Sequence, residues 1–229
     1  MQKIIAASSP GAGPDSKMPP LMEFFSPEMQ PMLNRAPSPR FLGTHMHPDN
    51  IPPSFTAKKT KTLVIFRNPK DTAVSFYHFS EKNPVLPTPE SWDKFYTEFM
   101  SGDVPWGSYF DHALAWEKRI DDPNVMILTF EELKQDLYRG VRQISQFFDF
   151  TLSEEQVQTI TQKSTFNAMK ENSKESHGDL TNVFFRKGVV GDWKNLFSEA
   201  QSEMMDAEFE KHLAGTKLGA KIKYELHCK

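Results

Sequence analysis

Two short runs of β-branched and aromatic residues stand out along the chain, at residues 62–66 and 125–130. Continuous runs of this kind are typical of strands that are buried on both faces of a parallel sheet. Each run is followed by apolar residues at helical spacing, over residues 72–79 and 131–148. Because strands that alternate with helices favour parallel pairing, the pattern predicts an α/β domain, a three-layer sandwich around a mostly parallel central sheet.

Four further segments predict helices, at residues 92–100, 109–120, 153–162 and 198–213. The third opens with Ser153-Glu-Glu-Gln156, which has the spacing of a capping box. In such a box the side chains at the two ends each bond the backbone N–H of the other residue.

The prolines divide the chain into two regions. Of the 17 prolines, eleven precede Ser54 and none follows Pro123. Proline removes a backbone donor and disfavours helix at the residue before it. We therefore expect the first fifty or so residues, including the proline-rich stretch 1–37, to be largely loop, and regular structure from Lys61 onward.

Composition narrows the class of protein. A chain of 229 residues is long enough for one domain with a buried core. The 27 Lys and Arg against 30 Asp and Glu give a net charge of −3, which excludes a globally basic nucleic-acid binder. The single cysteine, Cys228, excludes a disulfide-stapled module, and no apolar run is long enough to cross a bilayer. We expect a single domain over residues 1–229, cytoplasmic, with neither nucleic acid nor membrane as a partner.

A basic turn follows the first predicted strand. Arg67 stands directly after the strand, and Ser75 lies one to two turns into the following helix. In α/β sheets, ligands bind at the carboxyl ends of strands, where helix N-termini offer N–H groups to anions. The pair could therefore hold a phosphate. The alternative is that Arg67 is a surface charge and Ser75 a packing residue.

A second basic cluster is Arg186-Lys187-Gly188, which is followed by Gly191-Asp-Trp-Lys194. Two adjacent cations before a glycine place charge and an accessible backbone N–H on one loop, which is a workable phosphate clamp. The alternative is a solvated basic turn beside a packed Trp193. Two such loops in a chain of net negative charge favour an anionic ligand.

A third element, Ser38-Pro-Arg-Phe-Leu-Gly-Thr-His45, continues through Met46 to His47 and a proline. Histidine is well matched to proton transfer near neutral pH. His45 could be a general base, a structural histidine or a metal ligand. No third ligand is apparent nearby in the sequence, so we expect no metal site.

Taken together, these motifs resemble the successive motifs of cytosolic sulfotransferases. The resemblance rests on residues 38–45, 67–75 and 186–194 and runs in order from about Ser38 to the C-terminus, so that residues 38–229 match the family. The amino-acid sequence of these segments is most similar to that of the family 6 (6B) branch. The resemblance implies a P-loop-NTPase-like sulfotransferase fold. It also implies transfer of a sulfuryl group from 3′-phosphoadenosine 5′-phosphosulfate to a hydroxyl of a small phenol or alcohol, with iodothyronine-like phenols among the acceptors.

The resemblance also assigns roles in binding the sulfuryl donor. It implies that Arg67 and Ser75 hold the 3′-phosphate and that Arg186, Lys187 and Gly188 complete that pocket.

Beside the adenine the resemblance places Ser164, Phe166 and Met169, with Phe166 as the stacking ring. Phe130 stands where most members carry a tyrosine that reaches the adenine, so that hydrogen bond should be missing. His45 matches the histidine that takes the proton of the acceptor hydroxyl, which raises the reactivity of a poor nucleophile.

Two departures from the family pattern bear on activity. The family's 5′-phosphosulfate loop, a Tyr-Pro-Lys-Ser-Gly-Thr-Thr-Trp-like segment, does not occur in the sequence, and we expect it to precede Met1. Gly43 stands where many members have a lysine that stabilises the transferring group. The chain thus resembles an amino-terminally truncated sulfotransferase, and the alternative function is an inactive form that binds adenosine 3′,5′-bisphosphate (PAP) weakly.

One other class of enzyme can be weighed against this resemblance. A P-loop kinase or nucleotidase is disfavoured because the chain has no Gly-X-X-X-X-Gly-Lys-Ser/Thr motif.

The sequence also bears on the oligomeric state. Residues 194–203 lie where the family carries its short dimer motif, with Ser198 and Glu199 in place of a Thr-Val pair. We expect a monomer or a weak homodimer, because such a short segment buries little area.

Overall fold

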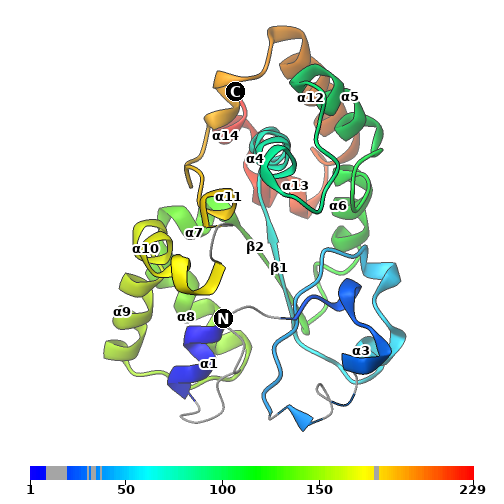
Figure 1. The fold of residues 1–229 in the computed structure, drawn as a ribbon. Helices are drawn as coiled ribbons and strands as arrows, with labels where there is room; N and C mark the ends of the chain where they lie inside the picture. The colour runs from blue at the N-terminus through cyan, green and yellow to red at the C-terminus, as the bar shows by residue number, and fades with distance from the viewer. Residues whose placement is uncertain (9–19, 30, 32–34, 37, 178–180) are drawn as a thin grey trace. The chain divides into compact units, whose positions relative to one another are not determined.

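The computed structural model describes residues 1–8, 20–29, 31, 35–36, 38–177 and 181–229 (Figure 1). They fall into two compact units. The strand unit comprises residues 47–135 and 179–229, and the helical unit comprises residues 1–46 and 136–178. Among the residues described, no helix has both the length and the apolar character needed to cross a membrane.

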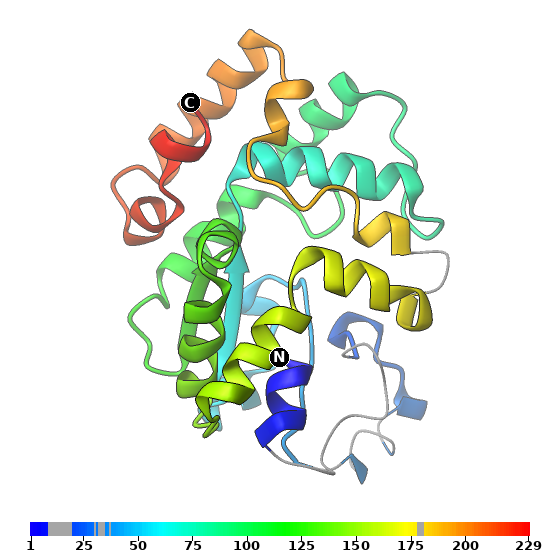
Figure 2. The ribbon, with the colours of Figure 1, turned by 90° about the vertical axis from the view of Figure 1, so that its left-hand side faces the viewer.

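The sheet of the strand unit confirms the predicted parallel pairing. β1 (Thr62–Phe66) and β2 (Val125–Thr129) run parallel, with Thr62 opposite Val125 and Phe66 opposite Thr129. β1 leads directly to α4 (Pro69–Lys82), as Figure 2 shows from the side. Phe130, predicted to be the last strand residue, instead begins α7 (Phe130–Gln135).

Capping residues set the beginnings of the helices between the two strands. Asn68 caps α4 and accepts a hydrogen bond from the backbone N–H of Asp71, while proline occupies the first helical position. Ser91 and Ser108 cap the next two helices in the same way. These are α5 (Trp92–Ser101) and α6 (Tyr109–Glu117).

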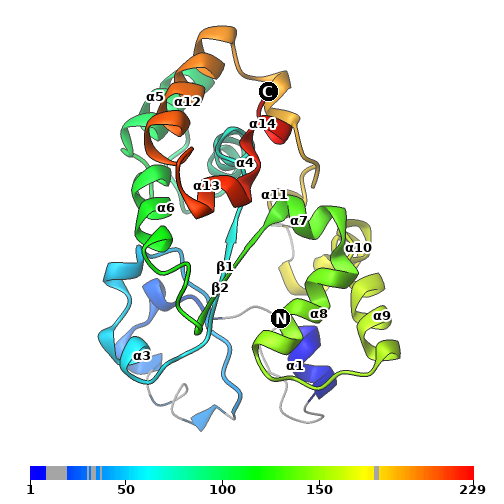
Figure 3. The same cartoon turned by 180° about the vertical axis from the view of Figure 1, so that it is seen from behind.

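The remaining elements of the strand unit are short, except for one helix. α12 (Glu199–His212) begins with a capping box of Ser198 and Gln201. The short helix at Lys217–Ile222, α13, lies beside α6, which is visible from behind in Figure 3. The short elements are η3 (Pro48–Asn50), α3 (Pro53–Ala57), α11 (Thr181–Phe184), η5 (Asp192–Asn195), α13 (Lys217–Ile222) and α14 (Tyr224–His227).

An aromatic core joins the strands to the helices of this unit. Phe66 from β1 and Ile127 from β2 are buried in one cluster with side chains of α5, α6, α12 and α13. Phe209 and Tyr224 stack with ring centroids 3.9 Å apart. Burial of such large apolar surfaces is the main favourable contribution to folding.

Lys70 ties α4 to the C-terminal segment. Its side chain is fully buried, and its ammonium donates to the Ser202 hydroxyl (2.6 Å) and to the Cys228 carbonyl (2.8 Å). It also pairs with Asp206 Oδ1 at 2.6 Å and lies over the Trp193 ring. A buried ammonium is stable only when it is paired in this way.

The helical unit contains α8 (Leu137–Phe147), α9 (Glu154–Lys163) and α10 (Phe166–His177). The predicted capping box at Ser153 is present, with both reciprocal hydrogen bonds. The single helix predicted over residues 131–148 is wrong, because α7 and α8 are separate. Asp136 leaves helical geometry (φ −148°, ψ 85°), and its side chain accepts from the N–H of Arg139 to start the second helix.

The first residues also differ from the predicted loop. α1 (Gln2–Ser8) is a helix in which Ile4 and Ile5 are each only 2% exposed. Gln156 of α9 donates to the Ala7 carbonyl at 2.9 Å, which closes the last turn of α1. Later described residues of the 1–37 stretch include the short turns η1 (Met22–Phe24) and η2 (Pro27–Met29), while 9–19, 30, 32–34 and 37 lie outside the described residues.

Candidate functional site

Arg67 occupies the carboxyl end of β1, as predicted. Its Nη2 donates to the Val189 carbonyl at 2.8 Å and lies 3.6 Å from Asp71 Oδ2. The guanidinium also lies over the Phe130 ring, 4.6 Å from the ring centroid. Burial lowers the pKa of Arg67, while Asp71 and Glu131 raise it, and an arginine so placed stays protonated. The cation is therefore held from two sides by the loop and by the start of α7.

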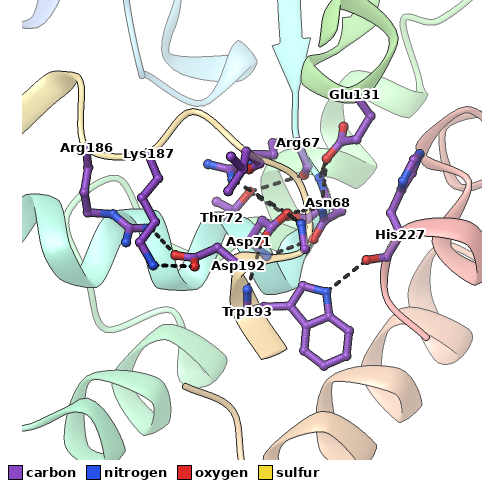
Figure 4. Close-up of polar contacts among 12 residues, drawn as sticks. Arg67, Asn68, Asp71, Thr72, Glu131, Arg186, Lys187, Asp192, Trp193 and His227 are labelled. Atoms are coloured by element: carbon purple, nitrogen blue, oxygen red, sulfur yellow. Dashed lines mark hydrogen bonds and ion pairs between the residues drawn. The ribbon is translucent and has the colours of Figure 1, made fainter. Parts of the chain in front are cut away.

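Asp71 joins the two basic motifs (Figure 4). Its Oδ2 accepts from the backbone N–H of Gly191 at 2.7 Å, and its Oδ1 accepts from that of Trp193 at 3.0 Å. Oδ2 also accepts from the Asn68 amide at 2.9 Å. Because all three donors meet one buried carboxylate, the turn after β1 and the loop around Gly191 are held as one piece.

The turn itself is held by buried polar groups. Glu131 Oε1 accepts from both the backbone N–H (3.0 Å) and the side-chain amide (2.8 Å) of Asn68. The Tyr109 hydroxyl donates to the Arg67 carbonyl at 2.8 Å, and burial raises the pKa of this phenol well above its ordinary value. Thr72 Oγ1 donates to the Asn68 carbonyl at 2.8 Å. These contacts leave the backbone that carries Arg67 little freedom.

Asp192 gathers the cations of the second motif. Its Oδ2 lies 2.5 Å from Arg186 Nη2, and its Oδ1 lies 2.7 Å from Lys187 Nζ. Asn195 donates to the same Oδ1 at 2.9 Å. The proximity of Arg186 to Arg67 also tends to lower the pKa of Arg67.

The exposure of these charges decides what an arriving ligand meets. The side chains of Asp71 and Asp192 are 0% and 5% exposed. Those of Arg67, Arg186 and Lys187 are 20%, 19% and 49% exposed. The carboxylates are therefore less accessible to solvent than the cations paired with them, so an arriving anion such as a phosphate would meet the positive groups first.

Acid should remove the stabilising effect of Asp192. Burial alone would raise the pKa of this carboxyl, but hydrogen bonds from Lys187, Arg186 and Asn195 outweigh burial and lower the pKa to about 2. Since the folded pKa is below the ordinary 3.8, the contribution is fully present above about pH 4 and is lost as the pH falls towards 2. We expect the difference in free energy of unfolding between wild type and Asp192→Asn to shrink over that range, measured by urea titration. A difference independent of pH would contradict this interpretation.

The backbone conformation at position 191 favours glycine over any residue with a side chain. Its φ is +86°, and a Cβ added there would meet nothing within 4 Å. The expected loss for Gly191→Ala is therefore purely conformational, about 1–2 kcal/mol of unfolding free energy. Gly215→Ala is the matched control, because a Cβ there also meets nothing and the backbone lacks a positive φ. Equal unfolding midpoints for the two variants would show that the left-handed conformation is not needed.

The other donor-binding candidates of the strand unit lie on these same elements. Ser75 is half-buried on α4, within the helix that Asn68 caps. Gly188 has φ +62° in the loop between the paired Arg186 and the carbonyl of Val189, which accepts from Arg67. The structure thus gathers one group of candidates in this unit, namely Arg67, Ser75, Phe130, Arg186, Lys187 and Gly188.

The helical unit holds the other candidates. Ser164 is the C-cap of α9, and Phe166 begins α10 two residues later. The Met169 N–H donates to the Thr165 carbonyl at 2.9 Å, so the three adenine candidates share one helix junction. His45 Nδ1 lies 2.7 Å from Glu23 Oε1. Among the described residues, no three or more His, Cys, Asp or Glu side chains are grouped as metal ligands would be.

Sequence reasoning missed the acidic and neutral partners of the cations. Asp71 and Asp192 lie inside the motifs that were singled out, so a carboxylate beside each arginine was a usable signal. Glu131 and Tyr109 gave no such signal, because their partners are 63 and 42 residues away in the sequence. Glu23 is 22 residues from His45 and was equally hidden.

Known proteins are similar to this chain in sequence. The sulfotransferase domain family matches residues 8–217. Sulfotransferase 6B1 of Danio rerio is 60% identical over 228 residues, which are 100% of this chain and 77% of that protein. The human protein of the same name is 51% identical over 209 residues, 91% of this chain and 69% of its own length.

Solved structures are also similar. Mouse sulfotransferase SULT7A1 complexed with PAP superposes with a TM-score of 0.86 at 33% identity, over 97% of this chain and 82% of that one. A retinol dehydratase complex with androsterone and PAP gives a TM-score of 0.72 at 28% identity, over 82% of this chain and 57% of that one.

Proposed function

Because the chain belongs to the sulfotransferase family, we propose that it transfers a sulfuryl group from 3′-phosphoadenosine 5′-phosphosulfate to the hydroxyl of a small phenol or alcohol. The observation that carries the proposal is the cluster of Arg67, Arg186 and Lys187, whose carboxylate partners are buried. Two similar structures contain PAP, which is the donor without its sulfuryl group.

In this proposal the strand unit binds the 3′-phosphate. Arg67 and Arg186 offer planar guanidinium groups that can each make two hydrogen bonds to phosphate oxygens, and Lys187 adds a point charge. Ser75 adds a hydroxyl donor, and Gly188 a backbone N–H. The Phe130 ring, which lies against the guanidinium of Arg67, keeps that cation in place.

The adenine and the acceptor are assigned to residues of the helical unit. Ser164, Phe166 and Met169 contact the adenine, with Phe166 stacked on it. His45 accepts the proton of the acceptor hydroxyl as its oxygen attacks sulfur, the bond between sulfur and the phosphate oxygen breaks, and PAP leaves. A base is needed because a neutral phenol or alcohol is a weak nucleophile.

We propose a class of acceptor, namely small compounds with a hydroxyl group, and this class includes iodothyronine-like phenols. The similar retinol dehydratase structures contain androsterone and retinol, which are both alcohols. We further propose that the chain acts in the cytoplasm, as a monomer or weak homodimer.

Donor binding is tested by removing the cations. We expect Arg67→Ala and Arg186→Ala each to weaken PAP binding by about 1.5–3 kcal/mol, the range for a hydrogen bond to a charged group, measured by calorimetry. Arg142→Ala is the matched control, because that arginine is 48% exposed and pairs with Glu154 on the surface of the helical unit. PAP affinities unchanged by both substitutions would contradict the assignment.

Turnover is tested separately with radiolabelled donor and a panel of phenols and alcohols. Labelled sulfated product supports the proposal. PAP binding that depends on Arg67 and Arg186, with no product from any acceptor, would instead favour the alternative, a form that binds the bisphosphate without transferring the sulfuryl group.

A further inference from the structure

The imidazole of His45 has a carboxylate partner that the proposed reaction does not yet use. Glu23 Oε1 lies 2.7 Å from His45 Nδ1 and also accepts from the backbone N–H of His45 at 3.0 Å. The carboxylate is only 12% exposed, while the imidazole is 52% exposed. One end of the ring is therefore held by a carboxylate that is mostly shielded from solvent, and much of the ring remains in contact with solvent.

The chain places these two residues together by pairing their segments. Leu21 and Gly43 form a parallel β-bridge, in which the Met22 N–H donates to the Gly43 carbonyl (2.9 Å) and the Gly43 N–H donates to the Pro20 carbonyl (3.0 Å). Glu23 and His45 each stand two residues after the bridged pair. Glu23 lies in the turn η1, which begins directly after Leu21, so the bridge brings this turn beside the segment that carries His45, and the His45 backbone N–H donates to Glu23 Oε1 at 3.0 Å.

The contact specifies the tautomer of the ring. Burial would raise the pKa of Glu23, but hydrogen bonds from its own backbone N–H and from His45 outweigh burial and lower it, so the carboxylate is ionised at neutral pH. An ionised carboxylate can only accept hydrogen bonds. His45 Nδ1 must therefore carry the proton in this contact, and in the neutral ring the lone pair is on Nε2.

We propose that Glu23 is a positioning residue for His45: it accepts the Nδ1 proton and thereby makes Nε2 the nitrogen that takes a proton from the acceptor. The catalytic part of this inference rests on the proposed function, whereas the tautomer does not. Glu23 itself exchanges no proton with the acceptor. Its effect is to hold the ring in one orientation and to stabilise the imidazolium that forms.

His47 provides a contrast within the same chain. Its Nδ1 accepts from the Asp49 backbone N–H at 3.3 Å, as the cap of η3. In the neutral ring the proton must then be on Nε2, the reverse of His45. Two histidines that are separated by one residue are thus expected to show opposite tautomers.

Nitrogen-15 NMR of the imidazoles, above the pH at which the rings are protonated, tests the assignment directly. The signals are assigned with His45→Ala and His47→Ala. We expect a protonated Nδ1 for His45 and a protonated Nε2 for His47. In Glu23→Gln the His45 ring should change to a mixture of tautomers, while Glu28→Gln, an exposed glutamate of the same segment, should leave it unchanged. A protonated Nε2 in wild-type His45, or a His45 signal unchanged by Glu23→Gln, would overturn the proposal.

Kinetics test the consequence for the reaction. We expect Glu23→Gln to lower kcat by about 10–100-fold, the range for an outer partner of a functional histidine, with KM and PAP affinity unchanged. A normal kcat together with a changed tautomer would overturn the positioning role. If the wild-type chain forms no sulfated product, the proposed function fails on that account, while the NMR result still decides whether Glu23 sets the tautomer.

Discussion

Replacing Asp71 by alanine is expected to lower the free energy of unfolding by about 3–5 kcal/mol, the range for breaking a buried charged network. The carboxylate is fully buried and accepts from the backbone N–H groups of Gly191 and Trp193 and from the Asn68 amide. Without it these donors lose their partner inside the protein, and Arg67 loses a neighbouring negative charge. Urea unfolding of the two proteins at neutral pH gives the difference.

Two further variants make this measurement specific. Asp71→Asn keeps the shape and one acceptor oxygen, so it should be destabilising by a smaller amount than alanine. Asp121→Ala removes a carboxylate that is 76% exposed and pairs with Lys217, and it should change stability by less than about 0.5 kcal/mol. If Asp71→Ala and Asp121→Ala unfold at the same urea concentration, the network around Asp71 does not stabilise the fold as argued.

Replacing His45 by alanine is expected to lower turnover by about 10²–10⁴, the usual contribution of a positioned general base. Binding of PAP should hardly change, because the residues proposed to hold the 3′-phosphate belong to the strand unit. The experiment compares kcat with labelled donor and PAP affinity by calorimetry, using the same preparations of each variant.

His47→Ala is the matched control for that experiment. Its ring nitrogen caps the three-residue turn η3, so its loss should affect stability slightly and turnover little. A His45→Ala protein with normal turnover would remove the base assignment. Equal losses of turnover in the two variants would show that the effect is not specific to His45.

The regular structure was largely predictable because its signals are local. The strand pair, the start of α4 at Pro69 and the capping box at Ser153 each follow from residues that are close in sequence. The break between α7 and α8 was not predictable from apolar spacing, which continues through it. It depends on Asp136, whose side chain can bond the backbone outside a helix. The helix at Gln2–Ser8 depends on burial of its two isoleucines and on the contact from Gln156 of α9.

In the candidate site, too, some residues have a local signal in the sequence and others depend on tertiary contacts. Arg67 and Arg186 could be found because arginine next to a strand end or a glycine is a recognisable local pattern. Their carboxylate partners were missed, because a carboxylate near an arginine in sequence signals an ion pair but does not distinguish a buried pair from a solvated one. Burial distinguishes the two cases, and burial is set by tertiary packing. The pairing of Glu23 with His45 depends on a bridge between segments 22 residues apart.

The contacts of Asp71 also set an order of events during protein synthesis. Its two backbone donors, on Gly191 and Trp193, lie 120 and 122 residues further along the chain. A ribosome makes the chain from the N-terminus, so both strands have been synthesised well before these donors exist. Until then the carboxylate lacks two of its partners, and the cluster of Arg67, Arg186 and Lys187 can assemble only after the loop around Gly191 has been made. Long-range closures of this kind are intrinsically slow, so newly made chains should pass through a state in which the strands are paired and this cluster has not yet formed.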